Sequence, residues 1–142
     1  MRFVFFDTWA YRALANRRDP YHERARVLDE ELARSGGVPI TTNYVLDETL
    51  TGIRADAGPR IAAVFGEGIY RAILRGLVRY ERIGAAREAE AFRWFTTFRE
   101  LRGLSFTDCA SFAVMRALDI EEVFTRDAHF EQVNLGFRRL LA

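Results

Sequence analysis

Residues 2–7 of the chain read RFVFFD, a short apolar run that ends at an acidic residue. Aromatic and β-branched residues over so short a stretch are typical of a strand buried in a sheet. An ionised carboxylate at the end of that strand, Asp7, needs a metal ion, an arginine or helix amides as its partner, because removing it from water alone is costly. The residues leave open whether Asp7 binds a ligand or only caps the helix predicted to follow Thr8.

Three more acids stand where a predicted strand or turn meets a helix. They are Glu48 in TTNYVLDE (residues 41–48), Asp108 in LSFTDC (residues 104–109) and Asp127 in VFTRD (residues 123–127). The carboxyl ends of parallel strands share one edge of a sheet, so the four acids are predicted to meet there. Grouped carboxylates repel one another away from water, and a divalent cation held by oxygen atoms is the usual reason for such a group. The pattern predicts a metal-dependent enzyme that acts on phosphates.

Each of these three acids also has a purely structural interpretation. Asp108 could pair with Ser105 to cap the helix that begins there, and Asp127 could cap the turn that follows it. A solvated helix face is the default interpretation for Glu48 and for its neighbour Asp47. The two compete, because consecutive helix positions point about 100° apart and only one would enter a shared site. The residues alone do not decide between them. His129, close to Asp127, is interpreted as a surface or packing residue.

Hydrophobic periodicity and turn residues predict that strands alternate with helices. The strands are expected at residues 2–7, 38–41, 76–83, 122–125 and 137–141, and the helices or helical turns at residues 9–14, 21–34, 43–56, 59–74, 85–102, 107–118 and 128–133. The charged positions of strand 76–83 favour a place near a sheet edge. Within helix 85–102, the side chains of Ala89, Phe92, Phe95 and Phe98 are predicted to face inward. The alternation implies one α/β domain over residues 1–142, with a parallel sheet covered on both faces.

The composition excludes several classes of protein and site. All 21 basic residues are arginine, which excludes a phosphate-binding loop that ends in Gly-Lys and any Schiff-base lysine. The single cysteine, Cys109, excludes an internal disulfide and a zinc cluster of thiolates. No apolar stretch is long enough to span a bilayer, and no signal-peptide pattern begins the chain, so a cytoplasmic protein is expected. Residues 54–102 hold ten arginines against six acids, which suggests either a basic rim or an ordinary solvated surface.

Four segments taken together resemble the PIN-domain family, specifically the VapC-like toxin ribonucleases. They are residues 6–8 (FDT), 42–49 (TNYVLDET), 104–112 (LSFTDCASF) and 124–130 (FTRDAHF). The resemblance covers nearly the whole chain and matches Glu48, not Asp47, to the acid that the family carries after the second strand. One departure is Trp9, where many members have a small polar residue.

The resemblance implies a fold and a set of site residues. The fold is a PIN-like three-layer α/β/α sandwich with a central, mainly parallel sheet of four or five strands. The catalytic acids are Asp7, Glu48, Asp108 and Asp127, of which the three aspartates hold Mg²⁺ or Mn²⁺. The residues themselves suggest hydroxyl groups that support these carboxylates, at Thr8, Thr107 and Thr125. Thr8 and Thr107 could instead cap helices, and Thr125 could bond a carboxylate or a metal-bound water.

The implied activity is cleavage of single-stranded or loop RNA by the toxin of a type II toxin–antitoxin pair. In-line attack of water would leave a 5′-phosphate and a 3′-hydroxyl. A small antitoxin protein and a second copy of the chain, as a homodimer, are the implied partners. Two alternatives remain open at this point: a Mg²⁺-dependent phosphatase or phosphotransferase of α/β type, and a non-catalytic nucleic-acid-binding module whose acids serve only as caps and ion pairs.

Overall fold

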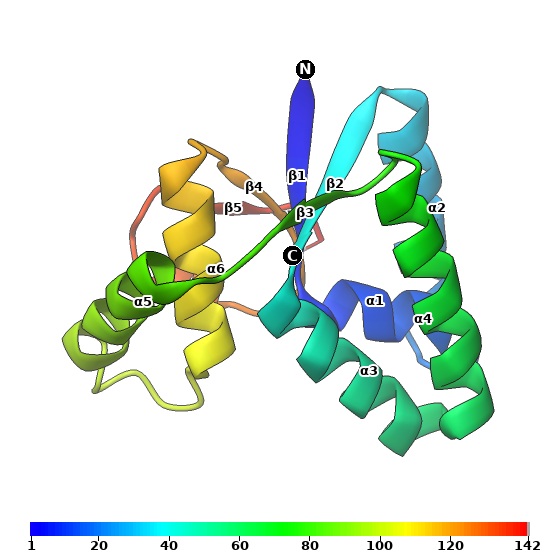
Figure 1. The fold of residues 1–142 in the computed structure, drawn as a ribbon, viewed down its shortest axis with the longest axis horizontal. Coiled ribbons are helices and arrows are strands. Elements are labelled where there is room, and N and C mark those ends of the chain that lie inside the picture. Colours follow the sequence, from blue (N-terminus) through cyan, green and yellow to red (C-terminus); the bar gives the residue numbers. More distant parts are fainter. Residues whose placement is uncertain (142) are drawn as a thin grey trace.

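The computed structural model describes residues 1–141 and contains a five-stranded parallel sheet with helices on both sides (Figure 1). The strand order is β3-β2-β1-β4-β5. The strands are β1 (Arg2–Phe6), β2 (Gly37–Thr42), β3 (Arg79–Glu81), β4 (Glu122–Phe124) and β5 (Arg138–Arg139). The helices are α1 (Thr8–Ala15), α2 (His22–Arg34), α3 (Asn43–Ala57), α4 (Pro59–Leu74), α5 (Ala85–Thr97), α6 (Phe106–Ala117) and α7 (His129–Gln132). The predicted α/β/α architecture is confirmed.

Strand β1 is the central strand, which explains why its sequence is so apolar. It pairs in parallel with β2 on one side and β4 on the other. Val4 and Phe5 are completely buried, because helices cover both faces of the sheet at this strand. The chain leaves β1 at Asp7 and leaves β4 just before Asp127, so the two acids emerge from neighbouring strands at the same edge.

The predicted edge position of the third strand is confirmed, but the strand is shorter than residues 76–83. Gly76 adopts a φ of +73°, and the Leu77 N–H donates a hydrogen bond to the Ala72 carbonyl. These contacts close helix α4 in a tight turn, for which glycine is favoured. The backbone is therefore free to pair with β2 only from Arg79 onward.

Helix α5 differs from its prediction in length and in the side that it buries. It ends at Thr97, and its buried residue is Ala91, whereas Phe92 and Phe95 are 59% and 41% exposed. The inward orientation predicted for these two rings, and for Ala89, is wrong. Phe98 is partly buried. Because α5 lies outside α6 and packs against it along a narrow stripe, a small residue fills the contact and the larger rings remain at its margin (Figure 1).

Helix α6 forms the centre of the core on its side of the sheet. Every residue from Asp108 to Met115 is buried, among them Phe112 and Cys109, both with no exposed surface. The helix lies between the sheet and α5, so its first turn is held firmly at the edge where β1 and β4 end. Within the part of the chain that the structure describes, no helix is long and apolar enough to cross a membrane.

Candidate active site

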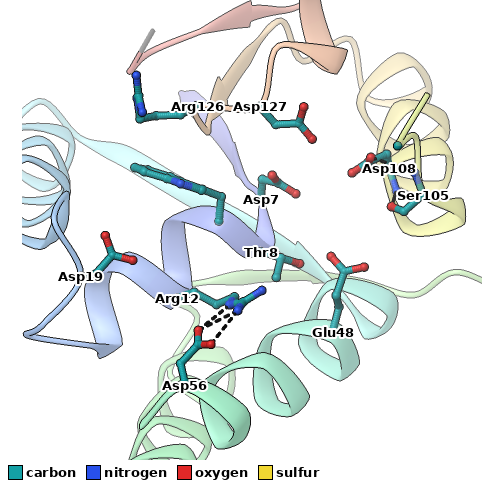
Figure 2. Close-up of a pocket in the computed structure, with 12 residues that line it drawn as sticks. Asp7, Thr8, Arg12, Asp19, Glu48, Asp56, Ser105, Asp108, Arg126 and Asp127 are labelled. Atoms are coloured by element: carbon teal, nitrogen blue, oxygen red, sulfur yellow. Dashed lines mark hydrogen bonds and ion pairs between the residues drawn. The ribbon is translucent and has the colours of Figure 1, made fainter. Parts of the chain in front are cut away.

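The four predicted acids line one pocket of about 670 Å³ at the carboxyl edge of the sheet. Asp7 follows β1, Glu48 lies on α3, Asp108 on α6 and Asp127 after β4. Figure 2 shows their carboxylates pointing toward a common space. Thr8, Trp9, Arg12 and Arg126 line the same pocket. Residues that are far apart in the sequence therefore form a single, strongly acidic site.

Asp7 is the most deeply buried acid of the pocket, with 4% of its surface exposed. Its Oδ2 accepts a hydrogen bond of 2.8 Å from the Thr125 hydroxyl, and within residues 1–141 its side chain makes no capping bond to α1. Burial, reinforced by the charges of Asp108 and Asp127, raises the pKa of Asp7 to about 8. Of the two roles left open by the sequence, the geometry favours a ligand-binding carboxylate over a helix cap.

Thr125 connects two of the acids. Its hydroxyl group, which is fully buried, donates to Asp7 and accepts a hydrogen bond of 3.0 Å from the backbone N–H of Asp127. The other two threonines are placed differently. Thr8 lines the pocket with a buried hydroxyl that has no hydrogen-bond partner among the described residues, and Thr107 lies beside Asp108, where its carbonyl accepts from Ser111.

Asp108 combines the two roles that its sequence position suggested. The Ser105 hydroxyl accepts a hydrogen bond of 2.9 Å from the Asp108 N–H, and Asp108 Oδ2 accepts one of 3.1 Å from the Ser105 N–H. This capping box fixes the first turn of α6 and aims the carboxylate at the pocket. Burial, together with the charges of Asp127 and Glu48, raises the pKa of Asp108 to about 6, against the lowering effect of its hydrogen bonds with Ser105.

Replacing Ser105 with alanine should loosen the Asp108 carboxylate without removing it. We expect the Ser105→Ala protein to lose about 1 kcal/mol of unfolding free energy, the usual contribution of a helix cap, and to bind Mn²⁺ more weakly. Urea denaturation and a Mn²⁺ titration measure the two effects. Ser105→Thr is the matched control, because it keeps a capping hydroxyl. Equal losses in both variants would contradict a role for the cap.

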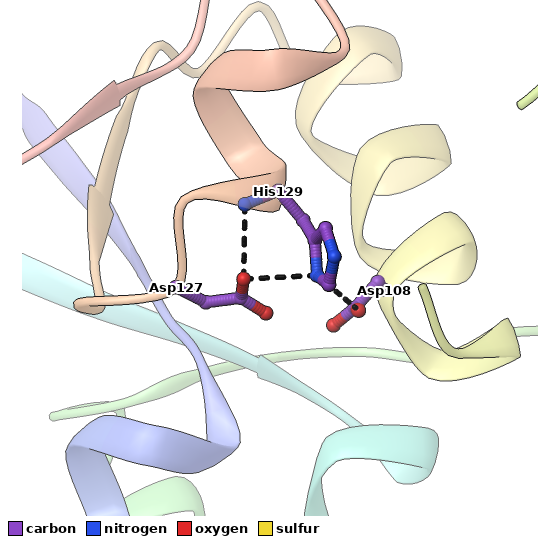
Figure 3. A group of neighbouring side chains, drawn as sticks. All are labelled: Asp108, Asp127 and His129. Carbon is purple, nitrogen blue, oxygen red and sulfur yellow. Dashed lines mark hydrogen bonds and ion pairs between the residues drawn. The ribbon is translucent and has the colours of Figure 1, made fainter. Parts of the chain in front are cut away.

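Asp127 and His129 form a second contact pair in the site (Figure 3). Asp127 Oδ1 accepts a hydrogen bond of 2.9 Å from the His129 backbone N–H and lies 2.9 Å from the ring Nδ1. The same Nδ1 is 3.9 Å from Asp108 Oδ2. On the opposite side of the ring, Nε2 is 2.7 Å from the Arg102 carbonyl oxygen, which can only accept. Nε2 therefore carries a proton, and Nδ1 faces the acids. His129 does pack against the Arg102 carbonyl, as a packing residue would, but its Nδ1 also faces two of the predicted acids.

Glu48 enters the pocket because of the way α3 begins. The Thr42 hydroxyl accepts a hydrogen bond of 3.0 Å from the Val45 N–H and caps this helix. From that start, Glu48 lies on the pocket side and is half-buried, whereas Asp47 is exposed. The structure thus places the acid that the family resemblance selected, and not its neighbour, in the pocket that Asp108 also lines.

The donor atoms in the pocket fit a divalent cation. One oxygen each from Asp108 and Asp127 and the Nδ1 of His129 lie within 4.8 Å of one another. Carboxylate oxygens with an imidazole nitrogen suit Mn²⁺, and carboxylates alone suit Mg²⁺. Asp7 lies outside this closest group, but its charge couples to both aspartates. Burial and, to a smaller extent, mutual repulsion raise the pKa of Asp7 and Asp108, and a bound cation would counter both effects.

Two arginines, Arg12 and Arg126, line the pocket beside the acids. Arg12 forms a bidentate ion pair with Asp56, at 2.9 Å from Nε and 2.7 Å from Nη2 (Figure 2). It reaches Asp56 across Gly52, where a Cβ would stand only 2.8 Å from the arginine Nε. The guanidinium of Arg126 instead lies 4.1 Å from the centre of the Tyr21 ring. Positive charge therefore borders the acids on two sides.

Comparison with known proteins shows the family of the chain. The family model that describes PIN-domain sequences matches residues 4–135 of the chain. The chain belongs to the PIN-domain family. The 23S rRNA-specific endonuclease VapC20 of Mycobacterium tuberculosis, strains CDC 1551 / Oshkosh and H37Rv, is 37% identical to this PIN domain over 127 residues, which cover 89% of this chain and 91% of the relative.

A solved structure agrees with this assignment. The crystal structure of Mycobacterium tuberculosis VapC20, described as a sarcin-ricin loop cleaving toxin, superimposes with a TM-score of 0.79 and 34% identity. The match covers 95% of this PIN domain and 96% of the other chain. The predicted resemblance to VapC-like PIN domains is confirmed.

Proposed function

We propose that this PIN domain, a single nuclease domain over residues 1–142, is a metal-dependent endoribonuclease and the toxin of a type II toxin–antitoxin pair. The observation that carries the proposal is the convergence of Asp7, Glu48, Asp108 and Asp127 on one pocket. The predicted activity, hydrolysis of RNA phosphodiester bonds, agrees with the activity named for a relative that matches nearly the whole chain, a 23S rRNA-specific endonuclease. We infer that a loop of ribosomal RNA is the substrate class to test first.

Each acid has a separate task in this proposal. Asp108 and Asp127, with the Nδ1 of His129, would hold Mg²⁺ or Mn²⁺. Asp7 would add the third aspartate carboxylate that the cation neutralises. A bound divalent cation would lower the pKa of a water molecule attached to it and would neutralise negative charge on the phosphoryl oxygens. Glu48 faces the aspartates from α3, across the pocket, where its carboxylate can orient the attacking water and accept its proton (Figure 2).

We also infer a protein partner, a small antitoxin, and a homodimer. Exposed apolar side chains along and after α4 support a protein interface. They are Ile61, Val64, Tyr70, Leu74 and Leu77, between 41% and 88% exposed. Exposed large apolar side chains on one helix and the turn after it favour a surface that a partner covers.

Incubation with ribosomal RNA tests the proposed activity directly. We expect the protein to cut the RNA with Mn²⁺ or Mg²⁺, to be inactive with a chelator, and to leave a 5′-phosphate and a 3′-hydroxyl. Sequencing adaptors that ligate only to a 5′-phosphate read out the product. A 2′,3′-cyclic phosphate would show that the 2′-hydroxyl of the RNA is the nucleophile, contrary to the proposal.

The same assay separates the two alternative functions. Metal-dependent release of phosphate from small esters, without cleavage of RNA, would indicate the phosphatase or phosphotransferase. RNA binding without any metal-dependent cleavage would indicate the non-catalytic nucleic-acid-binding module.

A further inference from the structure

An aromatic side chain stands beside the acids without belonging to the buried core. Trp9, in the first turn of α1, is half-buried and lines the same pocket as Asp7. Its ring centre lies 5.8 Å from that of Tyr21 and 6.4 Å from that of Phe124, so two aromatic neighbours hold the indole in place. A large flat apolar surface is thus fixed within a pocket that is otherwise mostly polar and charged.

A positively charged side chain, that of Arg126, lies close to the Trp9 ring. Arg126 precedes Asp127 and lines the pocket, and its guanidinium is stacked over Tyr21 at 4.1 Å, next to Trp9. Its Nε is buried and has no hydrogen-bond partner among residues 1–141. Arg12, the arginine on the other side of the pocket, is already bound to Asp56 through two nitrogens. Arg126 is therefore the better placed of the two to meet an incoming anion.

The chemistry of Trp9 and Arg126 together suits one nucleotide of a single RNA strand. An unpaired nucleobase offers a flat π face that stacks on an aromatic side chain, and the adjoining phosphate is anionic. An arginine fixed by stacking loses little freedom when it bonds to a phosphate. A phosphodiester that approaches four carboxylates also needs cationic and stacking contacts nearby, because the acids alone repel it.

We propose that Trp9 is a stacking platform for an unpaired RNA base beside the cleaved bond, and that Arg126 binds the phosphate of that nucleotide. This inference rests on the proposed ribonuclease function and names a recognition subsite for it. The subsite explains how an RNA loop is held at the acids: the base must leave its stack to reach Trp9. Fully paired RNA, whose bases are not free, would be a poor substrate.

Substitution of Trp9 tests the platform through binding. Base–aromatic stacking contributes roughly 1–3 kcal/mol per base, so Trp9→Ala should weaken RNA binding about 5- to 150-fold. The loss should appear mainly in KM and less in kcat, because stacking is equal in the ground and transition states. Trp9→Phe keeps an aromatic face and should recover most of the affinity. Equal affinity in Trp9→Ala and in the unsubstituted protein would overturn the proposal.

Fluorescence gives a second measurement that does not depend on how Trp9 variants fold. The chain has two tryptophans, so Trp94→Phe leaves Trp9 as the only one, and Glu48→Gln slows cleavage during the titration. With Mn²⁺ present, a short single-stranded RNA oligomer should quench the emission of Trp9. A fully abasic oligomer of the same length should not. Equal quenching by both oligomers, or none by either, would overturn the platform.

The outcomes for the two proposals remain distinct. Cleavage of RNA by the unsubstituted protein without any effect of Trp9→Ala on KM would refute the subsite alone. Absence of cleavage with every metal would refute the ribonuclease, whatever the fluorescence shows.

Arg126→Gln should weaken binding of the RNA oligomer and reduce the dependence of its affinity on salt concentration, as expected for a lost phosphate contact. An unchanged salt dependence would contradict the role of Arg126.

Discussion

The Asp7→Asn protein is expected to lose RNA cleavage by about 100-fold or more, and at the same time to become more stable in the absence of divalent ions. Even groups that only support a metal ligand contribute roughly 10- to 100-fold to activity or affinity, and Asp7 is part of the acidic site itself. The gain in stability has a separate cause. The substituted amide keeps an oxygen for the Thr125 hydroxyl, but the substitution removes a buried charge that the neighbouring acids repel.

The pH dependence of this effect follows from the raised pKa of Asp7, about 8 in the folded protein. The unfolded chain releases the same proton near pH 3.9. Between the two values the folded state holds a proton that the unfolded state lacks, so the stability contributed by this group falls as pH rises to about 8. The difference between the Asp7→Asn protein and the unsubstituted one should be near zero around pH 4. Above pH 8 it should reach roughly 2–5 kcal/mol, the upper end being four pKa units at 1.36 kcal/mol each.

Urea denaturation at pH 5 and pH 8 without divalent ions measures this difference. Asp47→Asn is the matched control, because Asp47 is an exposed acid next to Glu48. We expect that control to change the free energy of unfolding by less than about 0.5 kcal/mol, and to leave cleavage unaffected. An Asp7→Asn protein that is less stable than the unsubstituted protein at pH 8 would contradict a repelled, buried carboxylate.

The Thr125→Val protein should lose both stability and activity, although valine has nearly the shape of threonine. The substitution deprives Asp7 Oδ2 of its donor and the Asp127 N–H of its acceptor. Leaving buried polar groups without partners costs about 1–3 kcal/mol, and the Asp7 carboxylate is no longer tied to the Asp127 backbone. We expect a loss of activity of roughly 10- to 100-fold, as for other groups that orient metal ligands. Denaturation and steady-state cleavage measure the two losses.

Thr125→Ser separates the hydroxyl group from the methyl group. Serine can make both hydrogen bonds, so its activity should stay within a few-fold of the unsubstituted protein, while the lost methyl group costs about 1 kcal/mol in this fully buried position. If serine and valine impair cleavage equally, packing and not the hydrogen bonds positions the acids.

The meeting of Asp7 and Asp127 could be predicted from the sequence, because the rule that parallel strands share a carboxyl edge needs only the strands and their direction. The choice of Glu48 over Asp47 could not. It depends on the rotational phase of α3, which the Thr42 cap sets, and only the family resemblance indicated it. The prediction of which side of α5 is buried was wrong for a related reason. Periodicity there selected Phe92, but the fully buried residue at the contact with α6 is Ala91.

The polar neighbours of the acids were beyond sequence reasoning. Arg12 and Asp56 are 44 positions apart and meet because Gly52 lets the arginine lie against α3. His129 follows Asp127 by two positions, a spacing typical of no metal motif, and faces the acids only because the Arg102 carbonyl binds the other side of its ring. Such contacts depend on how loops and helices pack, and no local pattern in the chain records them.

The position of Cys109 has a practical consequence for labelling. This thiol, the only one in the chain, has no exposed surface, and burial together with the charge of Asp108 raises its pKa to about 12. A buried, protonated thiol reacts slowly with maleimides and with oxidants. A cysteine introduced on the surface would therefore accept a fluorophore selectively, and the native residue need not be removed first.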